Sequence, residues 1–326
     1  MKNFLYYSIM ALTVMGLSAS LLSCEEKSEI EAQIEAIAVE FDIVRFDEAF
    51  ASASPADLPK LKAQFPDFFP EQYPDSIWVA KLGDTLQDQL EEQVQQEFCS
   101  SEVIEEPLYS LFQHISYYFP SFQAPTVVTT TSDVDYRNPV ILADNLLIIA
   151  LDTYLGADHL FYVDIPQFLS KNMKPSQLVQ DVASTYARRY IARPSQRNLL
   201  AQMVYFGKEL YLKDLWLPKT PEAERIGYTS EELNWANDNE EEMWRYFVEN
   251  EILYSTDAKL PSRFISPAPF SKFFLEIDNE SPGMVGRYLG WKIVRSYMEH
   301  NGATLQQLLA TSAEEIFNNS KYKPTR

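Results

Sequence analysis

The sequence predicts an α+β protein, a mainly helical domain with a small inserted β-sheet. Most of the chain has apolar residues at helical spacing, whereas residues 126–151 contain the β-branched and continuous apolar runs that are typical of strands. Glycine accounts for only 9 of the 326 residues, less than half of the usual share of about 7%. This scarcity disfavours glycine-rich nucleotide loops and β-sandwiches with many tight turns.

The N-terminal part of the predicted domain consists of short elements. Apolar residues at positions 30, 34, 37 and 41 recur at steps of 4, 3 and 4, which predicts a helix. Residues 43–47 predict a short extended segment before a further helix. Five prolines then divide residues 51–76 into short helical turns and loops.

Two longer helices and the strands follow. Residues 78–99 are acidic, rich in glutamine and composed of good helix formers, so we expect one long exposed helix there. Residues 107–119 predict another helix. The β-branched run 126–131 and the apolar run 140–151 predict two strands joined as a hairpin, with Asp144-Asn145 as a second turn or a bulge.

The C-terminal half returns to helices, which we expect at 175–192, 196–215, 229–253 and 282–300, followed by short ones. Gly286 and Gly290 lie four residues apart on the last of these. Glycines at this spacing lie on one face of a helix and allow a neighbouring helix to approach closely. We therefore predict a packing role for both.

The N-terminus has the pattern of a lipoprotein signal peptide. Residues 4–22 carry no charge, Lys2 precedes them, and Leu21-Leu22-Ser23-Cys24 reads as a lipobox. This pattern predicts cleavage between Ser23 and Cys24, and fatty acylation of Cys24 with palmitate-type chains. An ordinary secretory signal with a chance cysteine, or a retained N-terminal helix, is the alternative.

The lipobox also sets the expected organisation of the chain. We predict a signal peptide at 1–23, a tether and helix close to the anchor at 24–40, and a single α+β domain at 41–326. With Cys24 acylated, Cys99 has no partner within the chain. We expect it to be a small buried residue, with an intermolecular disulfide as the alternative.

The charge of the chain excludes several classes of function. There are 27 basic and 47 acidic residues, a net charge of −20, so nucleic acids and anionic membrane surfaces repel the protein as a whole. Arg188, Arg189 and Arg193 form the only local basic cluster in the sequence. We single them out as a candidate site for an acidic partner segment, with internal ion pairing as the alternative.

The sequence lacks the catalytic motifs that were sought. It has no H-E-x-x-H, C-x-x-C, G-x-S-x-G or G-x-G-x-x-G pattern and no P-loop. Residues 237–242 are rich in oxygen ligands but lack the glycine and the alternation of a calcium loop, so we interpret them as a solvated helix face, with a weak cation site as the alternative. These absences predict a protein without catalytic activity, metal or cofactor.

Several sequence blocks resemble GldB, the gliding motility lipoprotein of the Bacteroidota. Besides the lipobox, they are Asp42–Asp47, Leu61–Phe69, Leu151–Gly156, Gly290–Met298 and Ser320–Pro324. The resemblance covers essentially the whole chain. It implies an envelope lipoprotein required for gliding, associated with the type IX secretion machinery, lipid-anchored at the periplasmic face of the outer membrane, and partnered by the small protein GldC.

A more distant similarity links the chain to predicted zinc peptidases, in which a β-hairpin edge strand precedes a helix carrying H-E-x-x-H. Here the helix expected at 175–192 follows the strands in the same order, but its segment 180–186 (QDVASTY) lacks both histidines. The comparison therefore suggests a degenerate zincin-like scaffold that has lost its metal. Function cannot be inferred from such a fold alone.

Three functions remain open at this stage. We expect a non-catalytic, membrane-anchored lipoprotein that acts by binding other proteins. A divergent peptidase would have to use carboxylates such as Glu209 or Asp214. A surface lipoprotein that binds a solute or glycan is suggested by the 19 tyrosines and 5 tryptophans, although aromatic residues of helical domains usually lie in the core.

Overall fold

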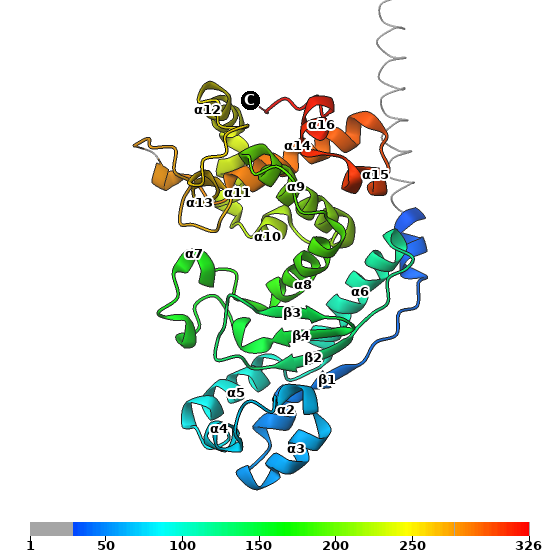
Figure 1. The fold of residues 1–326 in the computed structure, drawn as a ribbon, viewed down its shortest axis with the longest axis vertical. Coiled ribbons are helices and arrows are strands. Elements are labelled where there is room, and N and C mark those ends of the chain that lie inside the picture. Colours follow the sequence, from blue (N-terminus) through cyan, green and yellow to red (C-terminus); the bar gives the residue numbers. More distant parts are fainter. Residues whose placement is uncertain (1–28, 277, 326) are drawn as a thin grey trace, which may run out of the picture.

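The computed structural model describes residues 29–276 and 278–325 (Figure 1). It confirms the α+β class, because helices dominate and a single four-stranded sheet is described. Figure 1 shows this sheet in the middle of the molecule, with helices α2 to α5 at one end and α9 to α16 at the other. The predicted cleavage site and lipid attachment at Ser23 and Cys24 lie outside the described residues.

The sheet contains β1 (Ile43–Arg45), β2 (Thr126–Thr130), β3 (Val140–Ala143) and β4 (Leu146–Ala150) in the order β1-β2-β4-β3. Strand β2 runs parallel to both β1 and β4, and β3 is antiparallel to β4. Val127 of β2 and Leu147 of β4 are in register and fully buried. The central pair of strands therefore anchors the sheet in the hydrophobic core.

The predicted hairpin between 126–131 and 140–151 is wrong. The second run contains two strands, β3 and β4, and these form the hairpin about Asp144-Asn145, where Asp144 has a φ of 50° that suits a tight turn. Strand β2 pairs instead with the second arm of that hairpin and with β1, so the backbone groups of this buried strand have hydrogen-bonding neighbours on both edges.

The first helices are α2 (Phe46–Ala51), α3 (Leu58–Gln64), α4 (Asp75–Lys81) and α5 (Thr85–Glu97), preceded by helical residues at 29–35. Apolar side chains of α2, α3 and α4 form a small cluster of their own, whereas Leu90 and Val94 of α5 belong to the larger core. The long helix expected at 78–99 is interrupted, because Asp84 caps a new helix by accepting the backbone N–H of Leu86 at 2.8 Å. Cys99 is exposed rather than buried, since Phe98 occupies the buried position where α5 ends.

The larger core is built on α6 (Glu102–Tyr118), α8 (Pro175–Tyr190), α9 (Leu199–Trp216) and α14 (Val285–Asn301). Helix α6 begins five residues earlier than predicted, with Pro107 inside it. The other three lie close to their predicted bounds.

Shorter helices complete the C-terminal half. They are α7 (Gln167–Ser170), α10 (Glu222–Ile226), α11 (Ser230–Asp238), α12 (Glu240–Glu249), α13 (Leu260–Phe264), α15 (Leu305–Ala310) and α16 (Ala313–Asn319). The single helix expected at 229–253 is thus divided at Asn239. Glu240 is buried, not solvated, because its carboxylate accepts the hydroxyls of Tyr322 at 2.7 Å and Tyr288 at 3.0 Å.

Helices α9 and α14 make the closest helix contact of the molecule. Gly207 on α9 faces Gly290 on α14, and a Cβ atom on either would lie closer than 3.0 Å to backbone of the opposite helix. Gly286 is similarly close to Phe264. The packing role predicted for Gly286 and Gly290 is confirmed, and Gly207 is the partner that the sequence did not indicate.

Replacing Gly290 by alanine should therefore destabilise the protein. The added methyl group meets the carbonyl of Met203, so the helices must separate, and we expect the free energy of unfolding to fall by about 2–3 kcal/mol. Urea denaturation followed by circular dichroism measures this change.

Gly83→Ala is the matched control, because its Cβ would lie 3.7 Å from the nearest atom. We expect an effect within about 0.5 kcal/mol there. Equal effects of the two substitutions would contradict the close helix crossing.

Candidate functional site

A cavity of about 190 Å³ lies between α7, α8, α9, the turn after α10 and the beginning of α14. We call it the central cavity. Gln177, Asp181, Ser184 and Arg188 line it from α8, at steps of 4, 3 and 4 that place them on one helix face. Helix α9 contributes Phe206, Glu209, Leu210 and Lys213 at the same kind of spacing.

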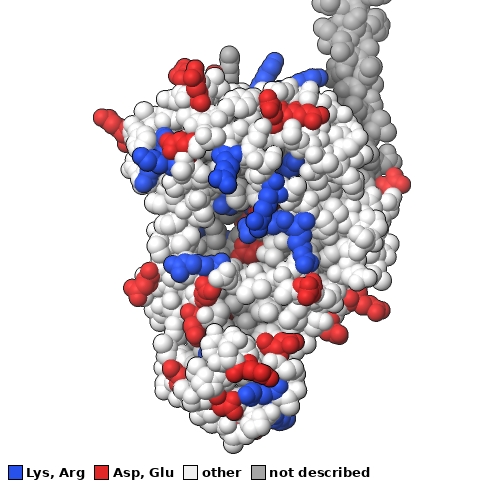
Figure 2. All heavy atoms as spheres, in the orientation of Figure 1, with Lys and Arg blue, Asp and Glu red and all other residues white. Residues whose placement is uncertain are grey.

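The central cavity is rich in positive charge. Arg188, Lys213, Arg225 and Arg287 line it, against two carboxylates, Asp181 and Glu209. In the chain as a whole acidic residues outnumber basic ones by 47 to 27. Figure 2 shows Lys and Arg side chains gathered about a hollow near the middle of the face in view. The cavity therefore reverses the charge balance of the rest of the protein.

Arg188, Glu209 and Arg225 form ion pairs within the protein. Glu209 accepts from Nε of Arg188 at 3.2 Å, and its side chain is 5% exposed. Arg225 donates from Nε to the carbonyl of Thr220 at 2.9 Å and pairs with Asp214 outside the cavity.

Lys213 and Arg287 have no such carboxylate partner. Among the described residues, no carboxylate oxygen lies within 4.0 Å of either side chain's nitrogens. Lys213 donates from Nζ to the carbonyl of Arg225 at 3.1 Å. Arg287 donates from Nε to the carbonyl of Ile265 at 2.7 Å, and its guanidinium lies 4.0 Å from the ring centroid of Phe206.

Burial controls the ionisation of this group of residues. It lowers the pKa of Lys213 and of Arg287, because a charged group loses its hydration inside the protein. Burial also raises the pKa of Asp181, which accepts the hydroxyl of Tyr154 at 2.8 Å. Both cations are therefore held in an environment that disfavours their charge.

The three arginines singled out in the sequence do not lie together. Arg188 lines the central cavity, whereas Arg189, adjacent on the helix but pointing elsewhere, donates to the carbonyl of Asp144 at 3.5 Å. Arg193 follows the end of α8 and lines a different cavity. Of the three, Arg188 alone belongs to the central cavity, and it makes the internal ion pair that was the alternative interpretation.

The positions of the missing zinc motif can be compared with this geometry. Asp181 and Ser184 line the central cavity, whereas Gln180 is buried outside it and its amide has no hydrogen-bond partner in the described structure. In the part of the chain that the structure describes, no group of three or more His, Cys, Asp or Glu side chains could hold a metal ion. The four cationic side chains that line the central cavity would repel a zinc ion. The similarity to zinc peptidases stays a prediction.

Asp214, one carboxylate considered for a peptidase, is fully engaged in hydrogen bonds. It accepts from Nε1 of Trp291 at 2.8 Å, from Nε and Nη2 of Arg295 at 2.7 and 2.8 Å, and from Arg225. Arg295 also pairs with Glu222 at 2.7 Å. The two arginines and two carboxylates form a neutral set that fastens α10 to α9 and α14.

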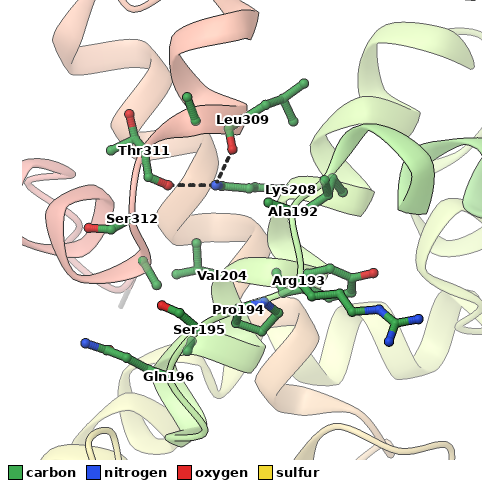
Figure 3. A pocket seen from close by; sticks show the side chains of 15 residues that line it. Ala192, Arg193, Pro194, Ser195, Gln196, Val204, Lys208, Leu309, Thr311 and Ser312 are labelled. Atoms are coloured by element: carbon green, nitrogen blue, oxygen red, sulfur yellow. Dashed lines mark hydrogen bonds between the residues drawn. The ribbon is translucent and has the colours of Figure 1, made fainter.

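A second cavity, of about 330 Å³, lies between residues 191–196 and 309–313 (Figure 3). Lys208 of α9 donates from Nζ to the carbonyls of Thr311 at 2.8 Å and Leu309 at 3.2 Å. The guanidinium of Arg193 extends away from Lys208 (Figure 3). Burial lowers the pKa of Lys208 to about 8.

Lys213 and Arg287 could not be identified as site residues from the motifs of the sequence. A signal was present for Lys213, because Glu209 and Lys213 lie four residues apart in a helix that is mostly apolar, where charged side chains are seldom buried without a partner. Arg287 had no comparable signal, since its burial depends on the crossing of α9 and α14.

These features define a mainly helical α+β protein with a charged cavity between its helices. Among the described residues, no helix has the length and apolar character needed to cross a membrane. The family model described as gliding motility protein GldB matches residues 27–324. The chain therefore belongs to the GldB family of gliding motility proteins. No curated protein and no solved structure matches it.

The low pKa of Lys208 gives a pH-dependent prediction. Between pH 8 and 10.5 the unfolded chain holds this proton while the folded protein releases it, so this lysine increases the free energy of unfolding as the pH rises. Relative to Lys208→Met, the wild type should gain on the order of 1–3 kcal/mol across this range. Urea denaturation at several pH values measures the difference.

Lys259→Met, at an exposed side chain, controls for the loss of a surface lysine. A difference between wild type and Lys208→Met that stays constant from pH 8 to 10.5 would contradict the burial of an ammonium group at position 208.

Proposed function

We propose that the protein is a non-catalytic, lipid-anchored protein of the cell envelope that supports gliding motility and the associated type IX secretion machinery by binding other proteins. Membership of the GldB family over residues 27–324 is the observation that carries this proposal. The family connects the chain with gliding, and the lipobox at the N-terminus supplies a means of holding it at a membrane.

The proposed anchor is the acylated Cys24, at the periplasmic face of the outer membrane. Each acyl CH₂ group buried in a bilayer contributes about 0.8 kcal/mol, so two or three chains give stable attachment. GldC and the envelope components of the gliding and secretion apparatus are the proposed partners.

Binding accounts better than catalysis for the chemistry of the central cavity. Its carboxylate Glu209 is paired with Arg188, and Asp181 accepts the hydroxyl of Tyr154. The groups that remain available are the cations Lys213 and Arg287, which suit recognition of an anionic group. A divergent peptidase is the second candidate, favoured by the location of Asp181 and Glu209 in one cavity.

Purification of the protein from its native envelope in mild detergent, with metal analysis of the same sample, tests this proposal. We expect GldC or other gliding and secretion components to accompany the wild type, with zinc far below one equivalent per chain. The Cys24→Ala variant cannot be acylated, so we expect it to incorporate no labelled palmitate and to be recovered without the partners that accompany the wild type.

One equivalent of zinc and no partner protein would contradict a binding role. It would favour the peptidase, as would hydrolysis of peptides by the purified wild type that Glu209→Gln abolishes.

A further inference from the structure

We propose that the central cavity binds an α-carboxylate group, with Lys213 and Arg287 as its direct partners. This chemistry is offered by the C-terminus of a polypeptide and by a free amino acid. The inference deepens the proposed function by naming a chemical group by which a partner is recognised, and it rests on that function for its biological setting.

Lys213 and Arg287 each have hydrogen-bond donors that the protein leaves unused. An ammonium group has three N–H donors and a guanidinium has five. Lys213 uses one on the carbonyl of Arg225, and Arg287 uses Nε on the carbonyl of Ile265. Within 29–276 and 278–325, the other donors of both have no acceptor in the protein. Lys213 is buried and Arg287 is partly exposed, and both line the same cavity. A ligand carboxylate there would accept charge-assisted hydrogen bonds from the donors that the protein leaves unused.

The charged side chains that line the central cavity favour an anionic ligand. Arg225 belongs to the neutral set formed with Asp214, Arg295 and Glu222. Without Arg225, the cationic side chains that line the cavity, Arg188, Lys213 and Arg287, still outnumber the two carboxyl side chains, Asp181 and Glu209, so the cavity favours an anionic ligand. A carboxylate supplies such a charge together with two acceptor oxygens for Lys213 and Arg287. A phosphate dianion would add a charge that the two carboxylates repel.

The size and polarity of the central cavity suit a single residue at the end of a polypeptide. The volume of about 190 Å³ exceeds that of a cavity of about 150 Å³ that holds a benzene molecule, which is room for one terminal residue. Phe206, Leu210 and Ile226 form an apolar part of the wall, so an aliphatic side chain beside the carboxylate would be buried favourably. Glu209 and Asp181 can accept hydrogen bonds from its amide or amine.

Lys208 in the second cavity differs from Lys213 in its hydrogen bonds. Lys208 is as deeply buried as Lys213, at 6% exposure for both. Its ammonium group, however, is directed at the carbonyls of Leu309 and Thr311 (Figure 3). Since both lysines lie on α9, Lys208→Met is a matched control for Lys213→Met.

The test is isothermal titration calorimetry of the full-length lipoprotein in mild detergent. The probes are acetyl-Ala-Ala-Leu with a free carboxylate, the same peptide with a C-terminal amide, free leucine and inorganic phosphate. We expect the free-acid peptide to bind, and the amide to bind at least about ten-fold more weakly. This comparison uses the wild type, so it does not depend on the folding of any variant.

Lys213→Met and Arg287→Met should each weaken binding of the free-acid peptide by at least about ten-fold, while Lys208→Met should leave it within about two-fold. Thermal denaturation monitors the folding of each variant. Leucine binding as tightly as the peptide would identify a free amino acid as the source of the carboxylate, and tighter binding of the peptide would identify a polypeptide end.

Four results would overturn the proposal: no binding of any carboxylate probe, equal binding of acid and amide, tighter binding of phosphate, or unchanged binding by a folded Lys213→Met. Failure here is separable from failure of the proposed function. The titration does not depend on envelope partners, and recovery of those partners does not depend on the synthetic peptide.

Discussion

The close crossing of α9 and α14 is the constraint on which the functional architecture depends. Gly207 and Gly290 bring the two backbones together at a distance that no side chain allows. Lys213 lies less than two turns beyond this contact on α9, and Arg287 lies one turn before it on α14. The crossing therefore holds two cations from distant parts of the sequence at one cavity, and the Asp214 set secures the same pair of helices nearby.

This arrangement places electrostatic strain inside a well-packed scaffold. The chain has a net charge of −20, yet its central cavity collects cations, two of which lack a carboxylate partner among the described residues. The cations lie beside a core that contains fully buried side chains such as Trp291. The proposed binding of an anionic group would give them a function besides packing.

Much of the helical framework could be predicted from the sequence, because α8, α9 and α14 carry strong apolar periodicity. The pairing of the strands could not be predicted, because the local residue pattern does not show that Val127 lies beside Leu147 in a parallel pair. The exposure of Cys99 and the burial of Glu240 were likewise set by tertiary contacts. Of the residues that line the central cavity, Arg188 and Glu209 could be named as candidates from the sequence. Lys213 and Arg287 could not, because they come together only where α9 and α14 cross.

We propose that partner proteins of this GldB-family member bind at the central cavity. Quantitative mass spectrometry of proteins that co-purify from native envelopes with the wild type, Lys213→Met and Lys208→Met measures this dependence. We expect partners recovered with the wild type to be strongly depleted with Lys213→Met and retained with Lys208→Met. An unchanged set of partners with a folded, membrane-anchored Lys213→Met would contradict it.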